Sequence, residues 1–315
     1  MNKHHTSNDV GALECNTKPS SQLHKPRVVI IGCGDVGERL IPLLIPHFRV
    51  FAVTSQASSS NRFAQLRRLG AVPIQANLDD ANSLWRLRQL SSRFVHLAPP
   101  ATFGEIDART RRLAAILPEK AQLVYISTTG VYGDCAGASF DEARTVAPSN
   151  ARAKRRVDAE KTLRTWAKRG ARNLSILRVP GIYAEDRLPI ERLQKGTPAL
   201  IDAEDVYTNH IHADDLAYVI KLALFRAMPS RVYHIVDDSA LKMGEYFDLV
   251  AKAYNLPPAP RLPRTELEKQ VSPMLLSFMS ESRRLQNQRL KLELGARLTY
   301  PEVSVALEKF RALAR

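Results

Sequence analysis

The chain has 315 residues, of which 44% are hydrophobic and 25% are charged, and its formal net charge is +14 at pH 7. These values are typical of a globular protein that buries a sizeable core. The longest apolar runs have the length of a strand and fall short of the roughly 20 residues that a membrane span needs. Residues 1–25 are polar, which predicts a disordered tail and argues against a secretory signal.

Three cysteines, Cys15, Cys33 and Cys135, are far apart and odd in number. They predict a protein of a reducing compartment, the cytoplasm, with no disulfide framework and no metal site. Basic residues are concentrated between Arg144 and Arg172. A solvated helix face accounts for them, and attraction of a phosphorylated ligand or of a nucleic acid is the alternative. No nucleic-acid-binding motif accompanies them, so we do not expect a nucleic-acid partner.

Strands and helices alternate along the first 180 residues. The predicted strands are 27–31, 48–54, 71–77, 93–98, 122–127 and 174–179. The predicted helices between them are 37–47, 62–70, 80–90, 105–117 and 151–169. This alternation predicts an α/β protein with a Rossmann-type, doubly wound parallel sheet.

The pattern loosens after Pro180. A helix is predicted at 213–227, where Asp214 and Asp215 would accept hydrogen bonds from the free N–H groups of its first turn. A strand is predicted at 231–237, and the remainder is mostly helical.

We therefore expect three parts along the chain. The tail covers 1–25, and a dinucleotide-binding Rossmann domain covers 26–180. The segment 181–315 is expected to hold a smaller substrate-binding subdomain together with late strands and helices of the Rossmann core.

A glycine-rich turn follows the first predicted strand and opens a helix. Its residues are Gly32, Cys33, Gly34, Asp35, Val36 and Gly37. Glycines at this spacing permit a sharp turn and the close approach of a pyrophosphate to the helix N-terminus, which attracts negative charge. Because the turn lies between a strand and a helix, we expect all six residues to contact a dinucleotide. A glycine-rich turn without a ligand is the alternative.

The end of the second predicted strand indicates which dinucleotide is bound. A cofactor without a 2′-phosphate usually meets an acidic residue about 20 residues beyond the glycines. This segment has none and carries Thr54, Ser55 and Arg62. Hydroxyl and guanidinium groups can bind a phosphate that a carboxylate would repel. The sequence therefore predicts NADP, with NAD less favoured, unless the serine-rich loop contacts no ligand.

More specific motifs follow in a fixed order. They are 76-ANLDD-80, 95-VHLAPP-100, 126-ISTTGVYGD-134, 178-RVPGIY-183, 209-NHIHADDLA-217 and 233-YHIVDD-238. With these motifs, residues 27–260 resemble the extended short-chain dehydrogenase/reductases, the NAD(P)-dependent epimerase/dehydratase family, and in particular its atypical subgroup. The turn reads GxGxxG, whereas extended members usually carry GxxGxxG.

The resemblance implies further binding residues. Those implied for the cofactor are Asn77, Leu78, Leu97, Ala98, Pro99, Ser127 and Pro180. Those implied for the substrate are Thr129, Arg187, His210 and His212, although His212 could equally be a core histidine. Thr128 holds the position of the family's active Ser/Thr, which hydrogen-bonds the substrate hydroxyl or carbonyl. Thr129-Gly130 stand where sugar-nucleotide dehydratases carry Asp-Glu, so water elimination is not expected.

The family's catalytic base is missing. That base is a Tyr four residues before a Lys, which lowers the pKa of the phenol so that it can take a proton near neutral pH. One register places Arg152 and Arg156 at these positions, and another places Asn150 and Lys154 there. The flanking motifs favour the first register. Neither register supplies a tyrosine, and neither Arg nor Asn can act as the base.

Asp107 is the candidate replacement for the base, because the resemblance places it near a proton-relaying residue. Alternatively it is an exposed helix residue paired with Arg111. Tyr132 and Tyr183 are further phenols near the site, although phenols at such positions more often pack in the core.

Together these features predict an NAD(P)-binding oxidoreductase or epimerase with a degenerate catalytic set, acting on a polar, sugar-derived small molecule. The alternative is a non-catalytic dinucleotide sensor or partner-binding protein, because the tyrosine is missing. A homodimer is also predicted, since Val157, Leu163 and Trp166 fit the family's pairing of helices. The same residues could equally pack against the sheet.

Overall fold

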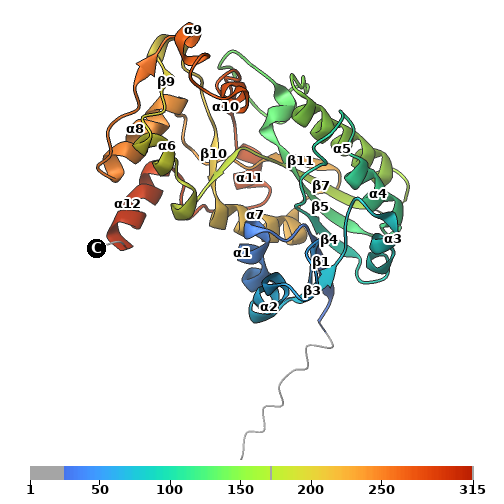
Figure 1. Ribbon diagram of the computed structural model, residues 1–315. Helices are drawn as coiled ribbons and strands as arrows, with labels where there is room; N and C mark the ends of the chain where they lie inside the picture. The colour runs from blue at the N-terminus through green and yellow to red at the C-terminus, as the bar shows by residue number, and fades with distance from the viewer. Residues whose placement is uncertain (1–24, 171, 314–315) are drawn as a thin grey trace, which may run out of the picture.

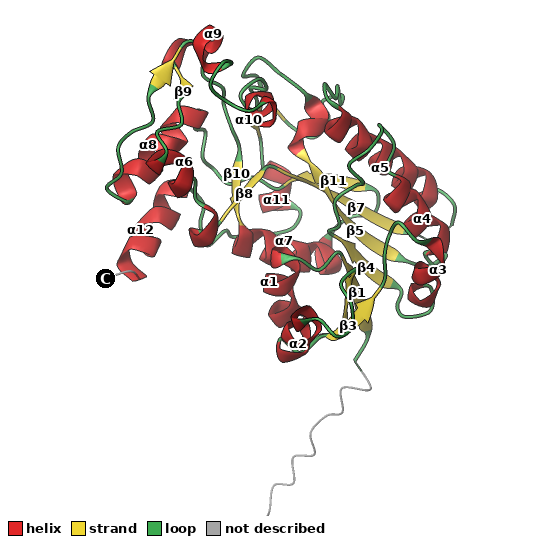
Figure 2. Ribbon diagram, viewed as in Figure 1, coloured by secondary structure: helices red, strands yellow, loops and turns green. Residues whose placement is uncertain are grey.

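The computed structural model describes residues 25–170 and 172–313. A central sheet lies between two layers of helices, and a smaller lobe of short strands and helices stands beside it (Figures 1 and 2). Residues 1–24 of the predicted tail, including Cys15, lie outside the described residues.

Seven parallel strands form the central sheet, in the order β11-β7-β5-β4-β1-β2-β3. They are β1 (Arg27–Ile31), β2 (Arg49–Thr54), β3 (Val72–Gln75), β4 (Arg93–His96), β5 (Gln122–Thr128), β7 (Asn173–Val179) and β11 (Arg231–His234). The order reverses between β1 and β4, which leaves a crevice at the carboxyl ends of the strands. The predicted Rossmann-type doubly wound sheet is therefore confirmed.

Helices cover both faces of the sheet. One face carries α1 (Asp35–Leu44), α2 (Asn61–Arg68) and α7 (Ala213–Arg226), and the other carries α3 (Ala81–Leu84), α4 (Ala108–Ile116) and α5 (Ala151–Ala167). Alternate residues of β1 serve the two faces, so that Val28 and Ile30 pack with α1 and α7 while Val29 and Ile31 pack on the opposite side. Strands buried on both sides require such continuous apolar runs.

Capping side chains set the starts of two helices, one of which differs from the predicted start. Helix α4 begins at Ala108, not at 105, because the Asp107 carboxylate accepts a hydrogen bond from the backbone N–H of Thr110 (3.1 Å). Helix α7 is capped by His212, whose Nδ1 accepts from the N–H of Asp214 (3.2 Å). Asp215 instead accepts from two backbone N–H groups at 299–300, so the predicted capping by the two aspartates is wrong.

The smaller lobe is built from segments after Pro180. Its elements are β8 (Gly181–Tyr183), α6 (Ile190–Gln194), β9 (Ala199–Leu200), β10 (His210–His212), α8 (Met243–Ala253), β12 (Arg261–Leu262), α9 (Arg264–Leu267), α10 (Pro273–Phe278) and α12 (Val303–Leu313). Phe247 and Val250 of α8 pack with Val303 and Leu307 of α12 in a separate hydrophobic core. Helix α7 and strand β11 return to the Rossmann sheet, and β13 (Arg284–Leu285) pairs with β6 (Ser139–Phe140). The chain thus crosses between the two lobes more than once.

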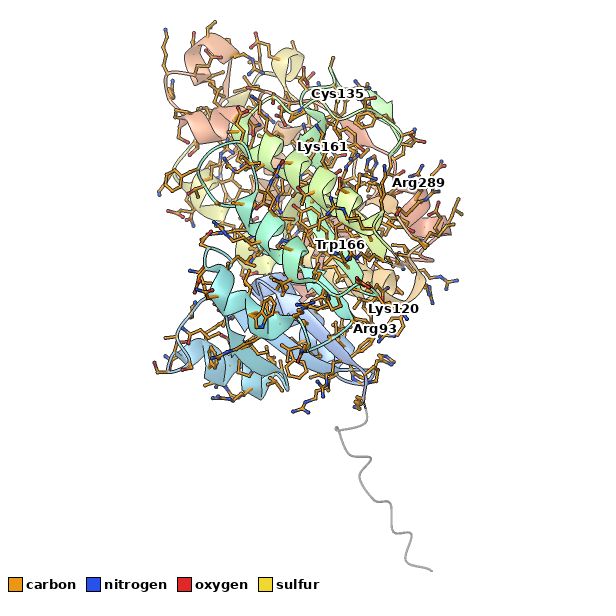
Figure 3. The ribbon with its side chains drawn as sticks, turned by 90° about the vertical axis from the view of Figure 1, so that its right-hand side faces the viewer. Arg93, Lys120, Cys135, Lys161, Trp166 and Arg289 are labelled. Carbon is orange, nitrogen blue, oxygen red and sulfur yellow. The ribbon has the colours of Figure 1, made fainter. Side chains whose placement is uncertain are left out.

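Helix α5 packs its apolar residues inward. Val157, Leu163 and Trp166 are all buried, the last two against the sheet. Lys161 is exposed on the outer face of this helix (Figure 3). The three apolar residues therefore fit the reading in which the helix packs on the sheet, and they give no support to the predicted homodimer.

A buried polar network joins β5, α5, β7 and β11. Arg178 donates from Nε and Nη2 to the carboxylate of Glu160 (3.0 and 2.7 Å) and from Nη1 to the Tyr132 hydroxyl (2.5 Å). The same hydroxyl lies 2.6 Å from Nε2 of His234, and the Ser127 hydroxyl donates to Glu160 (2.6 Å). Tyr132 is thus engaged in holding the core together.

The structure also allows the cysteines, the helices and the potential metal ligands to be compared with what the sequence predicts. Cys33 and Cys135 are buried and free. None of the helices in the described residues is long and apolar enough to cross a membrane. Within the same residues, no group of His, Cys, Asp and Glu side chains is arranged to hold a metal ion.

Candidate functional site

The glycine turn lies at the switch point between β1 and β4. Gly32 has φ +77°, and a Cβ atom placed on it would come within 2.5 Å of the Cα of Ala98. A Cβ on Gly37 would come within 2.7 Å of the Cys33 sulfur. Gly34 differs, since a Cβ there would meet no atom within 4 Å. The fold therefore needs Gly32 and Gly37, whereas Gly34 leaves open space at the N-terminus of α1.

This open space fits the diphosphate of a nicotinamide dinucleotide. The first N–H groups of α1 have no partner inside the helix, and Gly34 offers no side chain to cap them. An anion is favoured at such an end.

Asp35 would oppose an anion at this end, but its charge is compensated. Its carboxylate pairs with Arg39 (3.1 Å) and with Arg187 (3.2 Å), and Arg39 also pairs with Asp214 (2.6 Å). These pairs join the glycine turn to the smaller lobe. Arg187, predicted from the sequence to contact the substrate, thus also neutralises Asp35.

The residues predicted to select NADP lie at the end of β2 and the start of α2. Thr54 is half-buried and Ser55 is exposed. Arg62 donates to the Glu38 carboxylate and to the carbonyl of Cys33, and Gln65 donates to Glu38 (2.6 Å). The sequence segment has no acid, yet the fold brings Glu38 there from α1. Sequence reasoning missed this residue because it looked only along the chain from the second strand.

The other predicted cofactor residues line the same edge of the sheet or approach it. Leu97, Ala98 and Pro99 follow β4, where Ala98 contacts the glycine turn. After β3, Leu78 is buried, whereas Asn77 is exposed and its side-chain oxygen accepts from the N–H of Asp79 (3.0 Å).

Two cavities open at this edge. The smaller, of about 230 Å³, is lined by Val36, Leu97, Ile126, Ser127, Thr128, Arg156, Val179, Pro180, Ile182 and Leu216. The larger, of about 650 Å³, extends from the first turns of α5 into the smaller lobe. Both are lined by Thr128, Arg156, Pro180 and Ile182. A group bound in the smaller cavity would therefore be next to one bound in the larger.

Thr128 and Arg156 mark the boundary between the cavities. The Thr128 hydroxyl oxygen accepts from the N–H of Gly130 (3.2 Å), which leaves its hydrogen free to be donated. Arg156 donates from Nη1 to the Tyr125 hydroxyl (3.0 Å) and to the Ile126 carbonyl (3.1 Å). Burial raises the pKa of Tyr125 to about 12, so this phenol stays neutral.

The structure distinguishes the two registers at the missing Tyr and Lys. Arg152 and Arg156 both line the larger cavity. Lys154 is absent from this lining and pairs with Glu105 (2.6 Å). Asn150 also lines the cavity, and it caps α5 by accepting from the N–H of Ala153 (2.9 Å). The geometry favours the register with two arginines.

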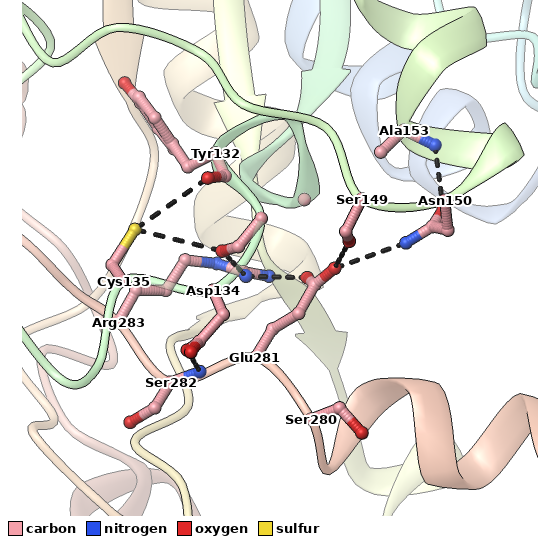
Figure 4. Close-up of polar contacts among 12 residues, drawn as sticks. Tyr132, Asp134, Cys135, Ser149, Asn150, Ala153, Ser280, Glu281, Ser282 and Arg283 are labelled. Atoms are coloured by element: carbon pink, nitrogen blue, oxygen red, sulfur yellow. Dashed lines mark hydrogen bonds and ion pairs between the residues drawn. The ribbon is translucent and has the colours of Figure 1, made fainter.

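Glu281 ties the C-terminal segment to the start of α5 (Figure 4). Its Oε1 accepts from the Ser149 hydroxyl (2.7 Å) and the Asn150 amide (3.2 Å), and its Oε2 accepts from Arg283 (2.7 Å). Glu281 and Arg283 line the larger cavity, together with Phe278 of α10. No local pattern in the sequence predicts this contact, because about 130 residues separate Glu281 from its partners.

Asp107 is neither exposed nor paired with Arg111. It is 1% exposed, and its Oδ2 accepts from the Thr110 hydroxyl (2.7 Å) in addition to the capping bond. Arg111 pairs with Asp158 instead. Asp107 does not line either cavity described above, so its geometry gives no support to a role as base.

A cluster of polar side chains lies on the side of the larger cavity opposite α5. Some of its members line the cavity, and Asp237 lies behind them. His210, Tyr183 and Tyr246 line the cavity, and the ring centroids of His210 and Tyr246 are 4.5 Å apart. Burial lowers the pKa of His210 to about 4 and raises that of Tyr183. Asp237 has a pKa raised by burial to about 8. Among the described residues, the Tyr183 hydroxyl, His210 Nδ1 and Asp237 Oδ2 have no hydrogen-bond partner. His210, Tyr183 and Tyr246 are therefore polar but uncharged near neutral pH. Arg187 and Arg192 also line the larger cavity from the smaller lobe.

Not all predicted substrate residues line the larger cavity. Thr129, Arg187 and His210 do. His212 does not line either cavity, since it is 2% exposed, caps α7 and stacks with Tyr300 at 3.9 Å between ring centroids. His212 is therefore a core histidine, which was the alternative to its predicted role in substrate binding.

Comparison with known proteins agrees with this architecture. No family model and no curated protein matches the chain in sequence. Among solved structures, a functionally unknown conserved protein from Silicibacter pomeroyi DSS is 28% identical, with a TM-score of 0.73 over 91% of this chain and 99% of that one. A UDP-glucose 4-epimerase from Thermotoga maritima, solved with UDP-glucose, is 17% identical, with a TM-score of 0.71 over 92% of this chain and all of that one.

A third similar structure contains both a dinucleotide and a nucleotide sugar. It is a UDP-glucuronic acid 4-epimerase from Bacillus cereus in complex with UDP-glucuronic acid and NAD, 15% identical, with a TM-score of 0.70 over 92% of this chain and all of that one. These structures share the Rossmann-type fold of this chain, and that fold agrees with the resemblance seen in the sequence.

We expect Gly34→Ala to weaken dinucleotide binding without unfolding the protein. The new Cβ meets no protein atom but occupies the space open to a pyrophosphate, so affinity should fall about tenfold or more, which is about 1.4 kcal/mol. The midpoint of urea unfolding should barely move. Gly32→Ala is the contrasting variant, because its positive φ and its collision with Ala98 should cost more than about 2 kcal/mol of stability. Tight dinucleotide binding by Gly34→Ala would contradict the assignment.

We expect Asp237 to make stability depend on pH. Its folded-state pKa, about 8, lies above its unfolded value of 3.8, so the folded state holds a proton that the unfolded state loses. Its contribution to stability should be fully present below about pH 4 and decline as the pH rises to about 8. The free energy of unfolding, measured in urea across this range, should fall less steeply for Asp237→Asn than for the unsubstituted protein. Parallel pH profiles would show that the Asp237 pKa is not raised.

Proposed function

We propose that the protein is an NAD(P)-dependent oxidoreductase or epimerase that acts on a polar, sugar-derived substrate. One observation carries the proposal: Thr128 and Arg156 line both a small cavity beside the glycine turn and a large cavity that reaches the second lobe. The cofactor's reactive ring and the substrate can therefore lie side by side across these two residues.

The chain's own residues have defined tasks in this proposal. The N–H groups at the start of α1 and the open space at Gly34 would hold the diphosphate. Leu97 and Val36 would line one side of the nicotinamide, while Pro180 and Ile182 line the other. A nicotinamide bound there would exchange a hydride with the substrate carbon.

Two residues would act on the substrate oxygen. The free hydrogen of the Thr128 hydroxyl can be donated to that oxygen, and Arg156 supplies a fixed positive charge next to it. Both stabilise negative charge on that oxygen, which develops when a hydride arrives at a carbonyl carbon and, in the opposite direction, when the hydroxyl loses its proton before the hydride leaves. The proposal thus replaces proton abstraction by a phenolate with electrostatic stabilisation, and the proton is exchanged with water.

The similar structures support a sugar-derived substrate. The two epimerases described above were solved with UDP-glucose and with UDP-glucuronic acid. A cavity of about 650 Å³ lies within the usual range for small-molecule sites.

A second candidate is dinucleotide binding without catalysis. It is favoured by the arginines at the positions of the family's Tyr and Lys, which leave no phenol on this face of α5. A protein of this kind would bind the cofactor and turn over no substrate.

For the cofactor, we propose NADP, recognised by Thr54, Ser55 and Arg62. Fluorescence titration should give a lower Kd for NADPH than for NADH. Arg62→Met should remove this preference, and Glu38→Gln should strengthen it, because Glu38 otherwise neutralises the guanidinium. A charge-assisted hydrogen bond is worth about 1.5–3 kcal/mol, so each shift should be about tenfold or more. A lower Kd for NADH would overturn the choice of NADP while leaving dinucleotide binding intact.

Turnover tests the catalytic proposal. The protein is incubated with NADP or NAD and a panel of nucleotide sugars and sugar acids, and products are followed by nicotinamide absorbance and by mass spectrometry and NMR for epimers. Thr128→Val should lower kcat about 100-fold, the typical loss of one donor to a developing oxyanion, while cofactor affinity stays within about twofold. Thr128→Ser should restore activity. Turnover of nothing in the panel, with cofactor bound, would favour the non-catalytic candidate.

A further inference from the structure

Three arginines project from one side of α5. Arg152, Arg155 and Arg156 are spaced i, i+3 and i+4, which places them together on the helix surface. All three line the larger cavity, and we refer to them as the arginine face. Sequence reasoning singled out Arg152 and Arg156 and missed Arg155.

No carboxylate among the described residues forms an ion pair with the arginine face. The Arg156 guanidinium donates to a phenol and a carbonyl. Arg155 is 8% exposed and donates to the carbonyl of Gly104 (2.6 Å), while its Nε has no partner in this part of the chain. Arg152 lies with its guanidinium carbon 4.5 Å from the centroid of the Phe278 ring. The neutral partners fix these groups without cancelling their charge.

The acidic residues nearby are engaged elsewhere. Glu281 is the one carboxylate among the described residues that line the larger cavity, and it accepts from Arg283, Ser149 and Asn150. On α5 itself, Asp158 pairs with Arg111 and Glu160 pairs with Arg178. The arginine face therefore concentrates three positive charges in one wall of a cavity, an arrangement that favours an anionic ligand.

The cofactor's phosphates do not account for these charges. The diphosphate cradle is at the N-terminus of α1, and the site proposed for the 2′-phosphate lies beyond β2. Arg152 and Arg155 line the larger cavity and are absent from the lining of the smaller one. Their charges thus face the space that the substrate would occupy.

We infer that the arginine face binds an oxyanion, either a carboxylate or a phosphoryl group, carried by the substrate close to the carbon that exchanges a hydride. A guanidinium presents paired N–H donors that match the two oxygens of such a group. The position that holds a base in the extended family would thus hold an anion-binding group here. The inference rests on the proposed function in taking the larger cavity as the substrate site.

Binding of three matched probes tests the inference. D-glucuronate, D-glucose 6-phosphate and D-glucose are titrated into the full chain by calorimetry, without cofactor. At least one anion should bind more tightly than glucose. The anion that binds more tightly shows whether the oxyanion of the substrate is a carboxylate or a phosphoryl group. Arg152→Met should weaken this binding about 10- to 100-fold, the usual loss for a charge-assisted hydrogen bond.

Lys161→Met is the matched control. It removes the same charge from the same helix, but Lys161 is exposed on the outer face, so anion affinity should stay within about twofold (Figure 3). Arg155→Met serves as a second variant, with its thermal unfolding measured because this side chain is buried. Equal binding of glucose and both anions, or an equal effect of the Arg152 and Lys161 changes, overturns the inference. Anion binding that depends on Arg152 in a protein that binds neither NADPH nor NADH would uphold it and refute the proposed function alone.

Discussion

The rest of the site depends on the close approach of two backbone segments at the switch point, the turn at Gly32 and the segment at Ala98. Strands β1 and β4 are neighbours, and the turn after β1 passes so near the segment after β4 that no side chain fits at Gly32. With Gly32 in this conformation, the chain turns directly into α1 and the open end of that helix faces the crevice. The place of Gly34, the orientation of α1 and the position of the smaller cavity, which Val36 and Leu97 line, follow from this contact.

Ion pairs and hydrogen bonds between distant parts of the chain close the site on its second side. Arg187 of the smaller lobe pairs with Asp35 of the glycine turn. Glu281 links the C-terminal segment to the start of α5. Partly exposed ion pairs contribute little to stability singly. Their structural effect here is to fix how the smaller lobe faces the sheet, and hence the shape of the larger cavity.

The larger cavity is lined by both neutral polar and cationic side chains. The wall from the smaller lobe carries His210, Tyr183 and Tyr246, whose shifted pKa values keep them neutral near pH 7. It also carries the cations Arg187 and Arg192. The wall from α5 carries the arginine face. Such a cavity is suited to orienting an anion and stabilising negative charge on it, and poorly suited to removing a proton with a side-chain base.

The sequence by itself determined the sheet, the glycine turn and the place of Thr128. Each depends on residues that are neighbours in the chain: the continuous apolar run 28–31, the glycine spacing at 32–37 and the end of the strand at 122–128. Turn geometry and strand burial are local properties, so a single sequence carries them.

Only the tertiary structure decided the electrostatics of the site. Arg62 looks free in the sequence, but folding brings Glu38 beside it. Asp107 looks exposed, but it caps α4 in the core. The two registers on α5 could not be separated until the face turned toward the cavity was known, and Glu281 reaches this helix from about 130 residues away. Charge compensation depends on distances in space between residues far apart in the chain, and no local pattern encodes those distances.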